Sequence, residues 1–139
     1  MKYIPKLKKL KKQQKRKNLK TITKTNSFTS LHISKTFIFK ALEPCVLTFI
    51  QLQAFYKACK KVLKRSGKII LKIFTHIPIT KKPLEVRMGK GKGSISCWIA
   101  KIKAGTTICE VKSNTILTVE KVFFYSKIKL PLKIRLCYL

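Results

Sequence analysis

A short ribbon of alternating glycine and lysine, Gly89-Lys90-Gly91-Lys92-Gly93, places the tightest local constraint on this chain. Glycine adopts φ > 0 readily and lets a backbone approach another surface closely. Alternation with lysine therefore gives a flexible ribbon that presents amide N–H groups and ammonium charges together. Such a ribbon suits a polyanion whose shape is followed at close range. Taken alone, the same pattern would also suit a mobile hairpin tip in solvent.

The charge balance around the ribbon favours the polyanion. The 139 residues include 33 Lys+Arg against 4 Asp+Glu, a net charge of +29. Self-repulsion of this size opposes folding, so the chain is expected to have a permanent polyanionic partner. Nucleic acid is the default partner, with an anionic membrane surface as the alternative. Hydrophobic residues make up 45%, enough for the core of one domain.

Several other classes of function fit the residues poorly. The ribbon lacks both nucleotide-binding spacings, G-x-x-x-x-G-K-[ST] and G-x-G-x-x-G. All four acids are glutamates, so acid–base pairs for an enzyme are nearly unavailable. No run of 18 uncharged apolar residues predicts a membrane span. A cationic membrane-surface protein would be built on one strongly amphipathic helix, whereas glycine loops and strands prevail here.

The cysteines and histidines predict no metal site and no cofactor. The five cysteines show no C-x-x-C pair, and His32 and His76 are far in sequence from other ligands. We expect reduced, structural thiols, with Cys59 and Cys97 on apolar faces.

The N-terminus predicts a basic RNA-binding arm over residues 1–27, followed by a domain over residues 28–139. Residues 1–24 contain eleven basic side chains and no acid, so the segment repels itself until phosphates neutralise it. A transit peptide is the alternative, but such peptides are rich in arginine and serine. This tail is rich in lysine and has no serine before Ser27.

The first half of the domain predicts a strand and then a helix. Residues 28–41 alternate loosely as a strand. Thr48 and Gln51 have capping-box spacing, so a helix should begin at about Phe49 and stop at Gly67. Its buried face is expected to consist of Leu52, Phe55, Cys59 and Val62, flanked by Ala58 and Leu63. Its basic side has no acidic partner at i,i+4, which favours RNA phosphate over solvent as the counter-charge.

The second half predicts four strands and one more helix. Residues 68–74 form a strand, and residues 98–103 pair with 106–111 as a hairpin. We expect Trp98 in the core rather than stacked on a base. Asn114 can cap a helix that runs to about Lys127, with Ile116, Val119, Phe123 and Ile128 on its buried side. Residues 130–136 form the last strand. The order favours an α+β two-layer domain of mainly antiparallel strands with two packed helices.

Three blocks of residues carry a resemblance to a known family. They are Lys64-Arg65-Ser66-Gly67-Lys68, Pro78-Ile79-Thr80-Lys81-Lys82-Pro83, and Val86 to Gly93 followed by the aromatic Trp98. Their order over residues 37–131 closely resembles the bacterial and organellar "L-sixteen" family of large-subunit ribosomal proteins. Two departures are visible: residues 42–46 replace a Gly/Arg-rich turn, and Ile116 and Leu117 replace first-turn acids. The second departure leaves apolar surface that could meet a neighbour.

The resemblance implies a structural constituent of the large ribosomal subunit that supports assembly and translation. It implies binding to large-subunit rRNA near the aminoacyl-tRNA site, with the basic loop towards the peptidyl-transferase region. Implied partners are rRNA, neighbouring ribosomal proteins and, transiently, tRNA. The expected rRNA-binding residues are Lys81, Lys82, Arg87, Met88, Gly89, Lys90, Gly91, Lys92 and Gly93 in the loop, and Lys57, Lys60, Lys61, Lys64, Arg65 and Lys68 around the helix.

The composition also bears on location. Lysine supplies 29 of the 33 basic residues and only four are arginine. The codons of Lys, Ile, Phe and Asn are compatible with strong A+T bias, and Ala, Gly and Arg are scarce. This bias points to an organelle, and we expect a mitochondrion rather than a plastid.

Overall fold

The computed structural model describes residues 12, 36–89 and 91–138. Their elements are, in order, β1 (Thr36–Ala41), β2 (Cys45–Thr48), α1 (Phe49–Leu63), β3 (Gly67–Leu71), β4 (Ile77–Lys81), β5 (Ser94–Ile102), β6 (Thr107–Ser113), α2 (Ile116–Lys127) and β7 (Ile134–Tyr138). The strands form a four-stranded sheet, β3-β6-β1-β7, and a three-stranded sheet, β2-β5-β4. All pairs are antiparallel. The predicted α+β class is confirmed; the predicted arm, apart from Lys12, and residues 28–35 lie outside the described residues.

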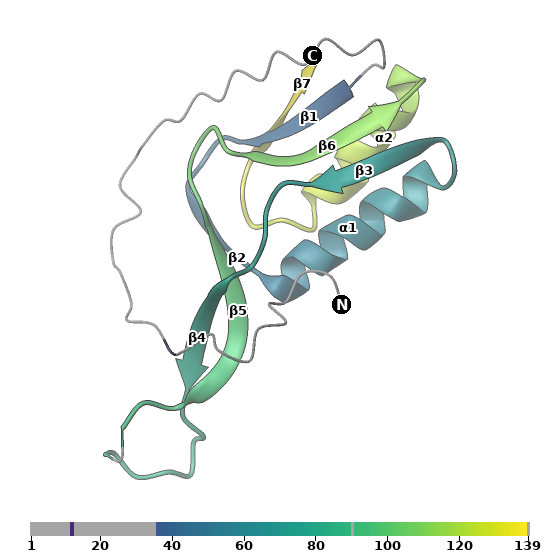
Figure 1. Ribbon diagram of the computed structural model, residues 1–139. Coiled ribbons are helices and arrows are strands. Elements are labelled where there is room, and N and C mark those ends of the chain that lie inside the picture. Colours follow the sequence, from purple (N-terminus) through teal and green to yellow (C-terminus); the bar gives the residue numbers. More distant parts are fainter. Residues whose placement is uncertain (1–11, 13–35, 90, 139) are drawn as a thin grey trace.

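One aromatic side chain joins the two layers of the domain. Helices α1 and α2 lie side by side on one face of the four-stranded sheet (Figure 1). Phe39 of β1 is fully buried beneath them. Its ring centroid lies 6.4 Å from that of Phe55 in α1 and 5.4 Å from that of Phe123 in α2, with both pairs edge-on. Edge-to-face pairs add to area burial, so Phe39 fixes both helices on the sheet.

Helix α1 begins as its sequence predicts and ends differently. The Thr48 hydroxyl accepts from the Gln51 N–H, and the Gln51 side chain accepts from the Thr48 N–H, completing the capping box. At the other end Lys64, with φ 47°, is the C-cap. Gly67 instead begins β3, where an added Cβ would lie 2.3 Å from the Lys112 carbonyl oxygen. The glycine is needed for close strand packing, so its predicted role as helix stop is wrong.

The predicted hairpin of residues 98–103 with 106–111 is wrong. The chain does turn at Gly105, which has φ 80°. However, the Gly105 N–H donates to the Ala41 carbonyl at 2.7 Å, and the Ala41 N–H donates to the Thr106 carbonyl at 3.0 Å. Because of these bonds, β6 pairs with β1 and not with β5. The two strands therefore belong to different sheets.

Helix α2 packs on the core through Val119 and Phe123, as predicted, but the rest of its buried face differs from the prediction. Val119, Val122 and Ser126 are buried, and Phe123 packs partly against the core. Ile116 and Ile128 are exposed, so their predicted burial is wrong. Thr115 rather than Asn114 is the N-cap, and it makes no side-chain capping bond. Apolar residues on both sides of this helix make its periodicity ambiguous.

Smaller differences concern strand ends and two core positions. Strand β3 ends at Leu71 and β7 begins at Ile134, because residues 72–76 cross between the sheets and 128–133 form a turn. In α1, Leu63 is fully buried and Val62 only partly. Trp98 is half-buried and outside the core cluster, opposite Pro78 in the three-stranded sheet. The prediction of a core tryptophan is therefore wrong.

Candidate nucleic-acid interface

The Gly-Lys loop, residues 82–93, stands at the tip of a projecting hairpin. Strands β4 and β5 pair from Ile77 with Ile99 down to Lys81 with Ser94, and the loop joins their ends. This hairpin extends away from the four-stranded sheet and the two helices (Figure 1). Ile99, Ala100 and Ile102 of β5 are buried, whereas Ser94, Ile95 and Ser96 are exposed. One end of β5 is thus anchored in the domain and the other carries the loop outward.

The loop glycines have two different structural causes. Gly89 and Gly91 have φ of 113° and 75°, and a Cβ at either would have no atom within 4 Å. These two positions need glycine for backbone conformation, not for space. A Cβ at Gly93 would lie 2.6 Å from the Lys81 carbonyl oxygen. Gly93 thus lets the hairpin base close, while the outer glycines shape an exposed backbone.

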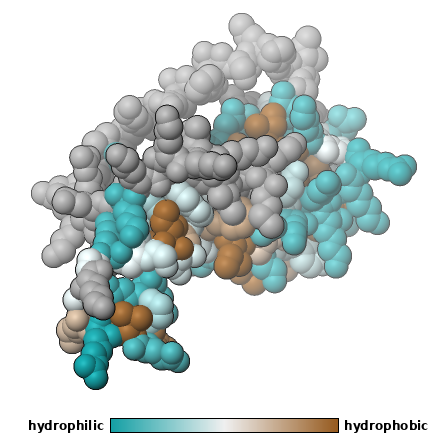
Figure 2. All heavy atoms as spheres, turned by 60° about the horizontal axis from the view of Figure 1, so that its bottom comes forward, coloured by the Kyte–Doolittle hydropathy of each residue, from teal (hydrophilic) through white to brown (hydrophobic). Residues whose placement is uncertain are grey.

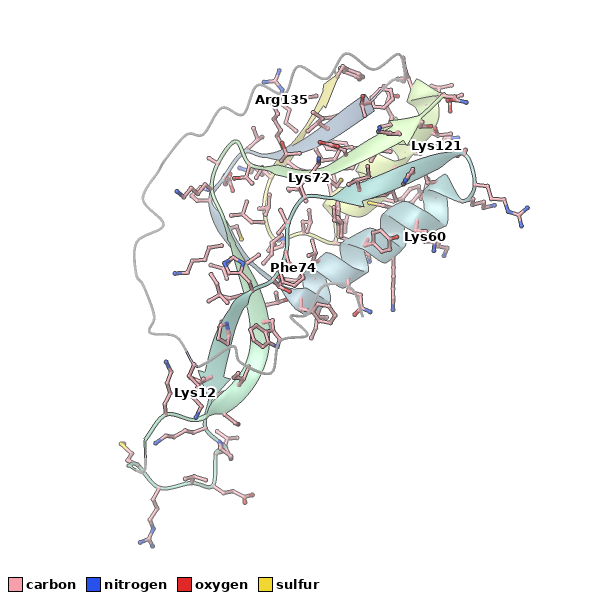
Figure 3. All side chains as sticks on the ribbon, viewed as in Figure 1. Lys12, Lys60, Lys72, Phe74, Lys121 and Arg135 are labelled. Atoms are coloured by element: carbon pink, nitrogen blue, oxygen red, sulfur yellow. The ribbon has the colours of Figure 1, made fainter. Side chains whose placement is uncertain are left out.

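Most predicted loop residues are open to solvent. Lys81, Arg87, Met88, Gly89, Gly91 and Lys92 are exposed, Lys82 and Gly93 are half-buried, and Lys90 lies outside the described residues. The Lys82 ammonium donates to the Gly89 carbonyl across the loop. Lys12 Nζ donates to the Lys92 carbonyl at 2.8 Å and lies beside the hairpin in Figure 3. Backbone carbonyls of the loop therefore bind the ammonium groups of Lys82 and Lys12, while Arg87 and Met88 are exposed.

A second basic surface, the helix lysine face, covers the C-terminal half of α1 and the turn after it. Its exposed members are Lys57, Lys60, Lys61, Lys64 and Arg65. Phe55 and Cys59 on the opposite side of the helix are fully buried. Figure 2 shows hydrophilic side chains at the end of the projecting hairpin and at the far end of the molecule in that view. The predicted loop and helix residues thus form two separate surfaces.

Comparison with known proteins identifies the family. The family model described as ribosomal protein L16p/L10e matches residues 5–137. The chain is also 38% identical over 138 residues to large ribosomal subunit protein uL16 of Carsonella ruddii (strain PV), covering 99% of both chains. The chain belongs to the L16p/L10e family of ribosomal proteins. It is a structural constituent of the large ribosomal subunit, which explains its excess of positive charge.

A third basic surface of this L16p/L10e chain was missed in the sequence. The sheet lysine face is the side of the four-stranded sheet opposite the helices. The strand registers place Lys112 between Thr36 and Lys68, and Lys40 opposite Arg135. Lys72, directly after β3, adds another ammonium group next to Glu110 of β6, and Figure 3 labels Lys72 and Arg135. Alternating polar residues in β1, β3 and β6 hint at an open face, but only strand order brings these cations together.

Like charges lie directly across the strands of this face. Lys68 is the cross-strand partner of Lys112, and Lys40 that of Arg135. Directly opposed like charges destabilise an antiparallel pair. Glu110 offers partial relief through an ion pair with Lys72, whose atoms are 2.9 Å apart. The sequence predicted Lys68 among the residues around the helix, but it lies on the sheet lysine face.

The described residues show little that suits other chemistry. They contain no group of three or more His, Cys or acidic residues able to hold a metal ion. Across the same part of the chain, no helix combines the length and apolar character that a membrane crossing requires. All five cysteines are free. Burial raises the pKa of the Cys59 thiol to about 11, and burial likewise raises that of Cys109 well above its ordinary value. Both thiols are protonated packing groups.

Proposed function

We propose that this chain binds large-subunit rRNA near the aminoacyl-tRNA site, with residues 87–93 directed towards the peptidyl-transferase region. The helix and sheet lysine faces anchor the domain by neutralising phosphates and releasing counterions. The loop follows a narrow RNA surface with backbone and lysine together. Its partners are rRNA, neighbouring ribosomal proteins and, transiently, tRNA. The chain supports late subunit assembly and translation without a catalytic step of its own.

The projecting hairpin is the observation that carries this proposal. A free solvent loop would gain nothing from two exposed glycines in left-handed conformation between cationic side chains. The hairpin base is closed around Gly93, so the loop is held at a defined place relative to the domain. A basic tip on a rigid stem can reach RNA that the domain itself cannot approach.

Directed cleavage tests the position of the loop. An Fe(II) chelate attached to Met88→Cys, in purified large subunits, would generate hydroxyl radicals at the fully exposed loop tip. We expect cuts in the rRNA of the peptidyl-transferase region. The unmutated chain, treated identically, controls for the native thiols. Cuts confined to other rRNA regions would contradict the proposed position, and an absence of cuts would contradict contact between loop and rRNA.

We further propose that the ribosome is mitochondrial. The support is the lysine-rich, arginine-poor composition, which fits an A+T-rich organellar genome. The relative named above is bacterial, so the location rests on composition alone. Mass spectrometry of ribosomes sedimented from purified mitochondria of the source cells should detect the chain in the large subunit. Its recovery from plastid or cytosolic ribosomes instead would overturn this location.

A further inference from the structure

The outer side of α2 carries an exposed apolar stripe that the rRNA-binding surfaces do not use. We define the outer α2 stripe as Ile116, Leu117, Phe124, Tyr125 and Ile128. Leu117, Phe124 and Ile128 are spaced by seven and four residues and so lie along one side of the helix, with Ile116 and Tyr125 flanking them. Leu117 is 72% exposed, Phe124 54% and Ile128 65%. Val119, Val122 and Ser126 bury the opposite side, so α2 is apolar on two sides.

This stripe has the wrong chemistry for RNA phosphate. The stripe carries no charge and only one hydrogen-bond donor, the Tyr125 hydroxyl, whereas the loop, helix and sheet surfaces each present several cations. Exposed Glu120 lies beside the stripe, but two exposed lysines of the same helix, Lys121 and Lys127, outnumber it. Contiguous apolar side chains on a soluble surface mark a protein contact more often than chance.

The charges around the stripe indicate what its protein partner presents. Lys121 lies beside the stripe, and Lys127 Nζ lies 4.9 Å from the Phe124 ring centroid. At the C-terminal end of α2, a shallow hollow is lined by Leu42, Phe123, Lys127, Leu132, Lys133 and Ile134. Lys127 links this hollow to the stripe through its contact with the Phe124 ring, and Lys133 is paired with Glu43 at 3.2 Å. Apolar centre and lysine rim together fit an amphipathic segment with acidic edges.

We infer that the outer α2 stripe docks a neighbouring protein of the large subunit through an amphipathic segment that is apolar in the centre and acidic at its edges. The inference rests on the proposed function only in placing the chain within the assembled subunit. Aromatic and aliphatic anchors fill the centre of such interfaces, and charged groups at the rim set orientation. Phe124 is the central anchor. Ile128 lies about one helical turn after it, and Leu117 lies about two turns before it.

Photo-crosslinking in purified large subunits tests the occupant. A benzophenone side chain replaces Phe124 in one chain and Lys61, on the helix lysine face, in another. We expect position 124 to crosslink a protein peptide that contains apolar residues and nearby Asp or Glu, and position 61 to crosslink rRNA. A crosslink from 124 to rRNA, to a second copy of this chain, or to a peptide without acids would overturn the inference, as would no crosslink. Failure at position 61 would instead count against rRNA binding by the helix lysine face.

A matched pair of substitutions tests whether the stripe itself supplies the contact. Leu117 and Ile50 are each the second residue of a helix, α2 and α1 respectively, and each is 72% exposed. Leu117→Lys should lower the crosslink yield from position 124 at least tenfold while the chain stays in the subunit. Ile50→Lys should leave the yield unchanged. Equal yields from the two variants, or equal losses, would overturn the assignment of the stripe as the docking surface.

Discussion

Glycine at Gly91 and at Gly93 serves two different purposes, which mutations can separate. At Gly91 the backbone has φ 75° and the added Cβ would meet no atom within 4 Å. A β-branched residue there strains the backbone without any clash inside the free chain. At Gly93 the obstacle is the Lys81 backbone, so bulk disturbs the hairpin itself. A functional defect of a Gly91 variant therefore reports on the surface that the loop contacts. A defect of a Gly93 variant reports on how the loop is attached to the hairpin.

Gly91→Val should impair translation more than it impairs incorporation. The domain remains anchored by its helix and sheet lysine faces, so occupancy of the large subunit should stay near that of the wild type. Peptide synthesis per occupied subunit should fall, through slow tRNA accommodation or stalled late assembly. Leu84→Val, at a 96% exposed loop position, is the control with the same new side chain. Wild-type synthesis from fully occupied Gly91→Val subunits would mean that the loop is only a tether.

The two buried thiols should resist modification until the domain unfolds. Burial raises the pKa of Cys59 to about 11 and raises that of Cys109 well above the ordinary value. The folded chain therefore holds these protons more tightly than the unfolded chain does. Their contribution to stability is complete below pH 9 and is lost, for Cys59, as the pH rises towards about 11.

Alkylation with iodoacetamide at pH 8.5, followed by mass spectrometry, checks this expectation. Half-buried Cys45, Cys97 and Cys137 should react in the folded protein, whereas Cys59 and Cys109 should react only after addition of denaturant. Equal rates at all five positions in the folded protein would show that the predicted core around Cys59 does not form.

At the scale of elements, helix α1 has a buried face that stabilises the fold and a basic face that we propose binds rRNA. Phe55 is fully buried and contacts Phe39 edge-on, whereas Lys60 and Lys64 are exposed. Phe55→Ala should lower the free energy of unfolding by about 3–5 kcal/mol, as for other buried aromatics. Lys60→Glu with Lys64→Glu should leave the melting temperature close to wild type but reduce incorporation into subunits. Circular dichroism melting and subunit occupancy measure the two effects, and identical melting of both variants would refute the assignment of faces.

Elements with strong local signals could be predicted from the sequence, and those set by long-range pairing could not. The capping box of Thr48 and Gln51 fixes the start of α1 within the segment itself. By contrast, the Ala41 backbone is hydrogen-bonded to Gly105 and Thr106, which are distant in sequence. Because these bonds pair β6 with β1, the hairpin that the local pattern predicts does not form. Short β2 has too few residues for a clear period. In α2, apolar residues on both sides of the helix make the periodicity ambiguous, so burial of Val122 rather than Ile116 could not be predicted.

At the scale of the whole molecule, some residues of the candidate site are predictable from local patterns and others become neighbours only through the fold. The Gly-Lys loop and the helix lysine face are contiguous in sequence, so their residues could be named before the fold was known. The sheet lysine face combines residues from β1, β3, β6 and β7. No local pattern joins Lys40 to Arg135 or Lys68 to Lys112, because strand order alone makes them neighbours. A chain with few acids leaves such clusters uncompensated until a polyanion binds.

Removing one like-charged pair from the sheet should therefore have opposite effects on folding and on binding. Lys68→Gln with Lys112→Gln relieves cross-strand repulsion, which should raise the stability of the free chain by roughly 0.2–1 kcal/mol. If the sheet lysine face binds rRNA as proposed, the same change removes two phosphate contacts. The slope of log K against log[salt] for rRNA fragments should become shallower by about 1.4–1.8, at roughly 0.7–0.9 for each contact. Lys121→Gln with Lys129→Gln, on and after α2 and outside the three basic surfaces, is the control and should leave the slope unchanged. Denaturant melts in low salt and filter binding across a salt series measure the two quantities. An unchanged slope in the sheet variant would mean that rRNA does not occupy the sheet lysine face, even if the stability of the free chain rises as expected.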